Sequence, residues 1–249
     1  MCRLLGVVSH APAPLTETLA TDLTPFAALS SIHCDGWGMS YWNQDDDLVV
    51  AKSPEAAQGS EDFWSAAKQA DTDAAILHLR KASAGMDPNP ANTHPFVAGG
   101  AAFAHNGFFT PLSAADRLLE ECGARTPEGD TDSERYFNLV LAAMRDVGPV
   151  DALQTVARRI TAASDHLVSL NALLLTQRSL FAFAFWDESV PPSPEAGTAT
   201  YELMFRVTAD AVTVASDGWE PEGPRWERIY NGMVLEVSRE DLRVTVHRG

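Results

Sequence analysis

The order of strand-like and helix-like segments constrains the fold of this chain more than any other feature. Short apolar or aromatic runs typical of strands lie at 1–8, 37–42, 48–52, 74–80 and 101–104, and helical spacing separates them at 15–31 and 61–70. Three more helices are expected, near Ser113, from Thr131 to Gly148-Pro149, and over 150–163. The remainder is rich in strands. An order of strands, helices and strands again predicts an α+β fold of two sheets with helices outside.

Three hairpins are expected in the last third of the chain. They pair 171–177 with 179–186, 202–208 with 211–215, and 228–230 with 233–237 around Asn231-Gly232. The segment 187–200, rich in Pro and Ser, separates strands of the same kind, so we expect it to be an exposed loop rather than a domain linker. Residues 1–249 are therefore expected to form a single domain.

Composition excludes several classes of function. The formal net charge of −16 over 249 residues disfavours surfaces that neutralise nucleic acids or anionic membranes, because both require clustered Lys and Arg. Three cysteines, without a CxxC pair, fit neither a disulfide framework nor a zinc site, and the scattered histidines lack ligand spacing. We expect no metal or cofactor. No secretory leader or membrane-spanning run is evident, so a cytoplasmic protein is expected.

Cys2 is the most reactive candidate in the sequence. Removal of Met1 would give Cys2 both a thiol and a free α-amine, so that the nucleophile would carry its own base. An α-amine with a pKa near ~7.7–8.0 is partly unprotonated at neutral pH. The alternative is a small buried apolar residue retained for packing.

Arg80 ends the buried strand 74–80, where its planar guanidinium is suited to a carboxylate ligand, although a structural salt bridge would need the same geometry. A long irregular loop follows it, 81–96, which contains His94; loops of this length are often functional.

Asn106-Gly107 follows the strand 101–104 and has two interpretations. Asn-Gly between apolar runs favours a type I′ hairpin turn. Alternatively, the Asn amide and the Gly N–H form an oxyanion hole. Further along, Asp130, Asp132 and Glu134 begin a helix, and N-capping accounts for one carboxylate rather than for all three.

Taken together and in this order, these features resemble the class II glutamine amidotransferases, which are N-terminal nucleophile hydrolases. Within that family the chain is similar to short, standalone members that begin Met-Cys-Arg and carry Asp-Gly-Trp-Gly, as at 35–38 here. That subgroup includes the γ-glutamyl hydrolase of ergothioneine biosynthesis. The resemblance implies a four-layer αββα sandwich of two antiparallel sheets.

The resemblance also implies roles for individual residues. Cys2 would be the nucleophile, with its freed α-amine as base, and Asn106 and Gly107 would form the oxyanion hole. The substrate would be glutamine or a γ-glutamyl compound, whose α-carboxylate would be held by Arg80 and whose α-ammonium by Asp132. Two further residues match positions that line the same pocket, Ser83 and His94. Ser83 stands where many relatives have Thr, and Lys81 also departs from the family pattern.

The sequence leaves the leaving group open. The chain shows no synthase domain to consume ammonia, so either a synthase partner subunit receives it or the protein is a hydrolase in its own right. Candidates for contact with a larger leaving group are Arg3, Trp37 and the segment Ser216-Asp217-Gly218-Trp219, and the alternative for each is core packing or a surface turn. A non-catalytic or regulatory glutamine-binding subunit is the remaining alternative.

Overall fold

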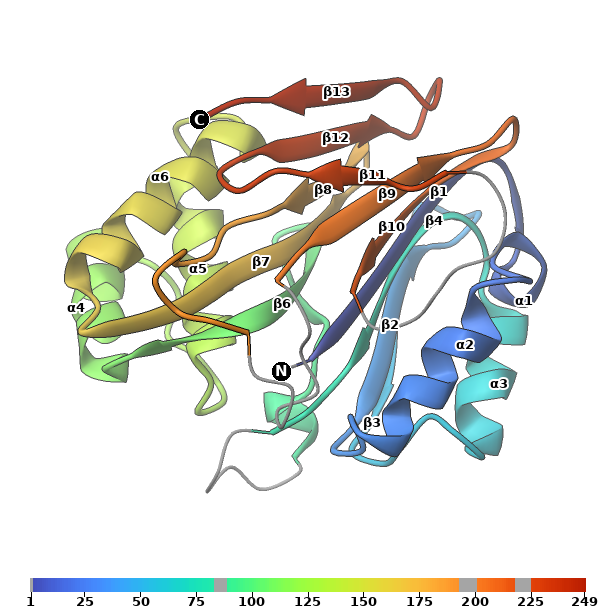
Figure 1. Ribbon diagram of the computed structural model, residues 1–249, viewed down its shortest axis with the longest axis horizontal. Coiled ribbons are helices and arrows are strands. Elements are labelled where there is room, and N and C mark those ends of the chain that lie inside the picture. Colours follow the sequence, from blue (N-terminus) through green and yellow to red (C-terminus); the bar gives the residue numbers. More distant parts are fainter. Residues whose placement is uncertain (1, 83–88, 193–200, 218–224) are drawn as a thin grey trace.

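The computed structural model describes residues 2–82, 89–192, 201–217 and 225–249, and the strands among these residues form two antiparallel sheets (Figure 1). The seven-stranded sheet has the order β11-β9-β10-β1-β4-β2-β3, made by Glu227–Ile229, Leu203–Val207, Ala211–Ser216, Arg3–Pro14, Asp71–Leu79, Trp37–Trp42 and Leu48–Ser53. The six-stranded sheet has the order β13-β12-β8-β7-β6-β5, made by Val244–His247, Val234–Ser238, Ser179–Phe183, His166–Thr176, Ala101–Thr110 and Phe96–Ala98. Both sheets include strands from the first and the second half of the chain.

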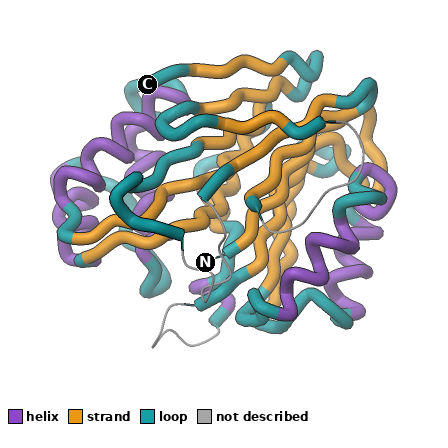
Figure 2. Tube along the Cα trace, viewed as in Figure 1, coloured by secondary structure: helices purple, strands orange, loops and turns teal. Residues whose placement is uncertain are grey.

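Helices cover the outer face of each sheet (Figure 2). On the seven-stranded sheet lie α1 (Leu15–Thr18), α2 (Leu23–Ala28), the 3₁₀ turn η1 (Leu29–Ser31) and α3 (Glu61–Gln69). On the six-stranded sheet lie α4 (Leu112–Glu121), α5 (Asp132–Ala143) and α6 (Pro149–Ala163). A short 3₁₀ turn, η2 (Pro90–Asn92), precedes β5. The expected αββα arrangement of two antiparallel sheets is confirmed.

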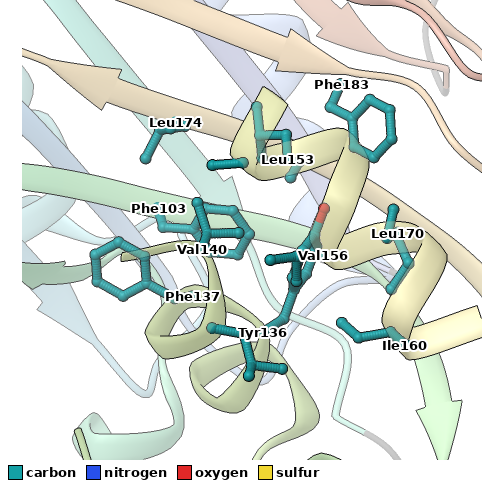
Figure 3. Close-up of a cluster of buried hydrophobic side chains, with 14 of the residues drawn as sticks. Phe103, Tyr136, Phe137, Val140, Leu153, Val156, Ile160, Leu170, Leu174 and Phe183 are labelled. Atoms are coloured by element: carbon teal, nitrogen blue, oxygen red, sulfur yellow. The ribbon is translucent and has the colours of Figure 1, made fainter. Parts of the chain in front are cut away.

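Three apolar cores hold the four layers together. One lies between the two sheets, and the other two lie between each sheet and its helices. Figure 3 shows the core beneath α5 and α6, where Phe103 of β6 meets Tyr136 and Phe137. The Phe103 and Phe137 rings stack with centroids 5.3 Å apart, and the Tyr136 ring meets Phe103 edge-on at 5.0 Å. These aromatic contacts fix α5 on β6, and α5 carries one of the candidate site residues at its start.

One of the three expected hairpins is wrong. The strand 227–229 is β11 and pairs with β9 in the seven-stranded sheet, whereas 234–238 is β12 and pairs with β8 and β13 in the other sheet. Asn231 lies between them, and its side chain exchanges two hydrogen bonds of 3.0 Å with the backbone of Trp186. The Asn-Gly turn therefore carries the chain from one sheet to the other, and tertiary pairing overrides the local turn preference.

Two other local expectations are corrected. The helical segment 15–31 is interrupted after α1 by a turn. Asp22, at the end of this turn, forms a buried ion pair with Arg206 of β9, with 2.5 Å between Oδ2 of Asp22 and Nη2 of Arg206. Asn106 and Gly107 lie inside β6, where they pair with Asn171 and Leu170 of β7. A type I′ turn at Asn106-Gly107 is therefore wrong, because the strand continues through both residues.

Candidate active site

The alternation of side chains along the central strands brings three of the candidate residues to one place. In β1, β4 and β6 the even-numbered residues face the core between the sheets, namely Leu4, Val8, Ala74, Ile76, Ala102 and Ala104. Cys2, Arg80 and Asn106 continue these three rows beyond the apolar residues. The apolar core between the sheets therefore ends in a group of polar side chains.

Pairing within and between the sheets sets this group at one end of the sandwich. Arg3 pairs with Leu79 in the antiparallel ladder, which puts Cys2 beside Arg80. Across the gap between the sheets, the His78 Nε2 atom lies 3.3 Å from the carbonyl oxygen of His105, the neighbour of Asn106. Cys2 and Arg80, at the ends of β1 and β4, consequently converge with Asn106 of β6 from the two sheets.

The Cys2 sulfur lies against the backbone of Lys81. The Lys81 N–H donates toward Sγ with an N to Sγ distance of 3.4 Å, and the Lys81 carbonyl oxygen lies 3.7 Å from Sγ. Burial raises the pKa of the Cys2 thiol, while the terminal ammonium, the Lys81 N–H and the Arg80 guanidinium act to lower it, and Asp132 adds to the increase. A thiol in this environment needs a base to become a nucleophile at neutral pH.

The Arg80 guanidinium is only 3% exposed, and its Nη1 atom donates to the backbone oxygen of Asp35 over 3.4 Å. Within the described ranges, no carboxylate forms an ion pair with it. The structural salt bridge that the sequence left open is therefore absent from this part of the chain. A buried cation without a counter-charge is costly, and an anionic ligand would offset that cost.

Asn106 and Gly107 are held from the side of β7. The Asn106 carbonyl accepts a hydrogen bond of 2.8 Å from the Ser169 hydroxyl, while its buried Oδ1 atom has no partner among the described residues. At Gly107, an added Cβ would lie 1.7 Å from the Ser169 oxygen and 2.4 Å from Nε2 of His105. Only glycine fits this position, and the side-chain amide of Asn106 remains available to a ligand.

Asp132 begins α5 and is not the residue that caps it. The Thr131 hydroxyl caps the helix by accepting from the Glu134 N–H at 3.1 Å. The Glu134 carboxylate accepts two N–H groups of the preceding loop, from Glu128 at 2.8 Å and Gly129 at 2.7 Å. Asp132 instead accepts the Phe109 N–H of β6 at 3.1 Å, two residues beyond Gly107. Its charge therefore lies beside the strand of the candidate oxyanion hole.

The two remaining predicted pocket residues differ in what the structure says of them. His94 lies against His78 of β4, two residues before Arg80, with its ring centroid 4.1 Å from that of His78 and 4.7 Å from that of Phe96. Burial lowers the pKa of His94 well below its ordinary value, and neither of its ring nitrogens has a partner among the described residues. Ser83 lies outside the described residues.

The sequence analysis did not identify the contact between His105 and Ser133, which lies next to the candidate oxyanion hole of β6. His105 Nε2 donates to the Ser169 carbonyl at 3.1 Å, and its Nδ1 lies 2.9 Å from the Ser133 hydroxyl. Burial lowers the pKa of His105, and the Ser133 hydroxyl beside its Nδ1 atom donates to Oδ1 of Asp132 at 3.2 Å. The pair ties β6 to the first turn of α5, and no local motif distinguishes it.

Of the residues expected on the leaving-group side, some lie in the core and others lie near Cys2. Trp37 is a core residue rather than a pocket residue, since it is 2% exposed and packs edge-on against Phe63 of α3 at 5.4 Å. Arg3 donates to the Cys2 carbonyl at 2.9 Å; burial lowers its pKa and the nearby Asp217 raises it. Ser216 accepts the Leu4 N–H at 2.9 Å, and 218–219 lie outside the described residues. Arg3 and Asp217 thus lie next to the nucleophile.

The described residues contain no group of three or more His, Cys, Asp or Glu side chains placed to hold a metal ion. None of the helices in the same residues is both long enough and apolar enough to cross a membrane.

Comparisons with known proteins identify the family and the fold. A family model described as "Glutamine amidotransferases class-II" matches residues 1–189. No curated protein matches the chain. Among solved structures, a glutamine aminotransferase class-II domain protein from Silicibacter pomeroyi is 18% identical, with a TM-score of 0.71 and coverage of 99% of both chains.

Two other solved structures share the fold. Glutamine phosphoribosylpyrophosphate amidotransferase from B. subtilis is 19% identical with a TM-score of 0.69; the match covers 99% of this chain and 49% of that one. A predicted glutamine amidotransferase from Pseudomonas aeruginosa is 19% identical with a TM-score of 0.58, covering 98% and 99% of the two chains. The present chain thus spans about half the length of the B. subtilis enzyme.

Proposed function

We propose that this chain, which belongs to the class II glutamine amidotransferases, is a cysteine-dependent amidohydrolase that cleaves the γ-amide of glutamine or of a γ-glutamyl conjugate. The observation that carries the proposal is the buried guanidinium of Arg80, beside Cys2 and without an ion-pair partner in the described part of the chain. The α-carboxylate of a glutamyl group would supply the missing negative charge. Asp132 would supply the anion for the α-ammonium of the same group.

The reaction then follows from the neighbours of Cys2. After removal of Met1, the α-amine of Cys2 takes the thiol proton and the sulfur attacks the γ-carbonyl carbon. The Asn106 amide and the Gly107 N–H stabilise the tetrahedral oxyanion. The carbon–nitrogen bond breaks, the amine leaves with the transferred proton, and a thioester on Cys2 remains. Water hydrolyses the thioester, which releases glutamate and restores the thiol.

The leaving group distinguishes two forms of this activity. Free glutamine releases ammonia, which a synthase partner subunit could consume. A γ-glutamyl conjugate, as in ergothioneine-type thiol biosynthesis, releases a larger amine. Arg3, which donates to the Cys2 carbonyl, and the nearby Asp217 would contact such an amine. We further propose that residues 1–249 act as one domain and, because all three cysteines are free thiols, that the enzyme works in a reducing cytoplasm.

The test is ammonia release by untagged protein from L-glutamine, which leaves glutamate, and from glutaramate, which lacks the α-amino group and leaves glutarate. Cys2→Ala should abolish release, and Arg80→Ala should lower kcat/KM by about a hundredfold, because truncating one member of a buried charge pair is expensive. Arg117→Ala, on an exposed position of α4, is the matched control and should leave both parameters unchanged.

Asp132→Asn separates binding of the α-ammonium from general damage. The variant should raise KM for glutamine by about tenfold or more and leave turnover of glutaramate nearly unchanged, since only glutamine presents a cation. Release of glutamate by Cys2→Ala at the wild-type rate would refute the proposal. Equal loss on both substrates in Asp132→Asn would refute the assignment of the α-ammonium to Asp132.

A further inference from the structure

The Asp-Gly-Trp-Gly segment at 35–38 approaches the nucleophile although none of its side chains contacts the Cys2 sulfur through a hydrogen bond in the described residues. Asp35 precedes β2, is partly exposed, and lies beside the end of β4. Four hydrogen bonds join Asp35 and Gly36 to residues 80–82. Residues 80–82 include Lys81, whose backbone contacts the Cys2 sulfur.

The two peptide units that contact the Cys2 sulfur are both held on their far side by Asp35. In the unit between Arg80 and Lys81, the N–H donates toward Sγ at 3.4 Å, and the carbonyl accepts the Asp35 N–H at 3.1 Å. In the next unit, the Lys81 carbonyl lies 3.7 Å from Sγ, and the Ala82 N–H donates to the Asp35 carboxylate at 2.8 Å. Because peptide units are planar, fixing one end of each unit orients the other.

We propose that the Asp35 carboxylate is a positioning residue that holds the Lys81–Ala82 peptide unit in the orientation which places the Lys81 carbonyl against the Cys2 sulfur. The inference rests on the proposed function, in which Cys2 acts as a thiolate. Without the carboxylate, the Ala82 N–H loses its partner and the second peptide unit is free to rotate. The Lys81 backbone then no longer holds the sulfur in a fixed arrangement of donor and acceptor.

This arrangement also explains why an acid, and not only a glycine-rich turn, precedes the strand. The backbone bonds of Asp35 and Gly36 to Arg80 would survive truncation of the side chain, because the Asp35 N–H and the Gly36 carbonyl make them. The side chain itself contacts the Ala82 N–H, with the Cys34 thiol 3.9 Å away. Loss of the Asp35 carboxylate should therefore affect Cys2 more than the site where Arg80 would bind the α-carboxylate of the substrate.

The experiment uses Cys34→Ser/Cys122→Ser protein, in which Cys2 is the remaining cysteine. The rate of Cys2 alkylation by iodoacetamide is measured against pH, alongside kcat and KM for glutamine. Asp35→Ala should slow alkylation near neutral pH by about tenfold, move its pH profile upward and lower kcat by a similar factor, since the Lys81 backbone that contacts the sulfur is then anchored on one side only. KM should change by less than about threefold, because a hydrogen bond to the substrate is not removed.

Asp35→Asn is the matched variant, because its amide oxygen still accepts the Ala82 N–H. It should recover most of the alkylation rate, and it remains informative if Asp35→Ala fails to fold. Equal pH profiles for wild type and Asp35→Ala, or a loss confined to KM, would overturn the positioning role. Alkylation that depends on Asp35 in protein that lacks glutaminase activity would uphold this role while contradicting the proposed function.

Discussion

The packing around Gly107 leaves no room for a side chain at this position. A Cβ at this position would overlap the Ser169 carbonyl and approach the His105 ring, both of which are buried. Gly107→Ala should lower the free energy of unfolding by about 3 kcal/mol or more, because backbone atoms of a central strand must shift. It should also lower kcat, since the N–H offered to the oxyanion moves with the strand.

The control for Gly107→Ala is Gly148→Ala, where an added Cβ meets nothing within 4 Å. Denaturant unfolding and glutamine turnover are measured for both. A Gly107→Ala protein as stable and active as Gly148→Ala would contradict the close packing described for β6.

Residue identity predicted three side chains that the structure brings together, and it missed the backbone contacts around them. Cys2, Arg80 and Asn106 stand out because each is a reactive or polar residue at the end of an apolar run. The Lys81 N–H and the Asp35 contact with Ala82 have no such sign, because every residue except proline carries the same backbone groups.

At the scale of elements, the start of α5 joins helix capping to the proposed binding of substrate by Asp132. Thr131 caps α5 and Ser60 caps α3 in the same way. The distances from the hydroxyl oxygen to the backbone nitrogen that donates to it are 3.1 Å and 3.2 Å. Replacing either with alanine should cost about 1 kcal/mol of unfolding free energy. Only Thr131→Ala should raise KM for glutamine, because Asp132 follows it directly and α3 carries no proposed site residue.

Thermal unfolding and steady-state kinetics on the two cap variants test this difference. A KM that rises equally in Ser60→Ala would show that KM reports loss of stability rather than the position of Asp132.

The order of elements also explains which pairings were predictable. Alternation and turn residues located most strands, and the order of segments predicted two sheets. The pairing of β11 with β9 instead of β12 was not predictable from Asn231-Gly232, because the choice is made by strands far away in the chain.

At the scale of the whole molecule, buried histidines between and behind the sheets link stability to pH. Burial lowers the pKa of His78 to about 3, and it also lowers the pKa values of His94 and His105. Each ring takes up a proton on unfolding below pH ~6.5, so its contribution is complete above that pH and is lost as pH falls toward the folded-state pKa. The free energy of unfolding should fall by about 1.4 kcal/mol per pH unit for each histidine.

Burial raises the pKa of Asp22, so Asp22 changes the pH dependence of stability in the opposite direction. Comparing His78→Gln with wild type isolates the contribution of the His78 ring, because Asp22 is the same in both proteins. Urea unfolding between pH 7 and pH 4.5 should give a shallower decline for His78→Gln, while His10→Gln, at an exposed position, should follow wild type. Parallel curves for all three proteins would show that His78 is not held neutral in the fold.

The most direct measurement of the central claim is the intact mass of untagged protein before and after incubation with 6-diazo-5-oxo-norleucine, followed by peptide mapping. We expect a single adduct on Cys2 of protein that has lost Met1, and its absence in Arg80→Ala. No adduct on protein whose mass shows Met1 removed, or an adduct on Cys34 or Cys122, would contradict the assignment of Cys2 as the nucleophile of a glutamine site.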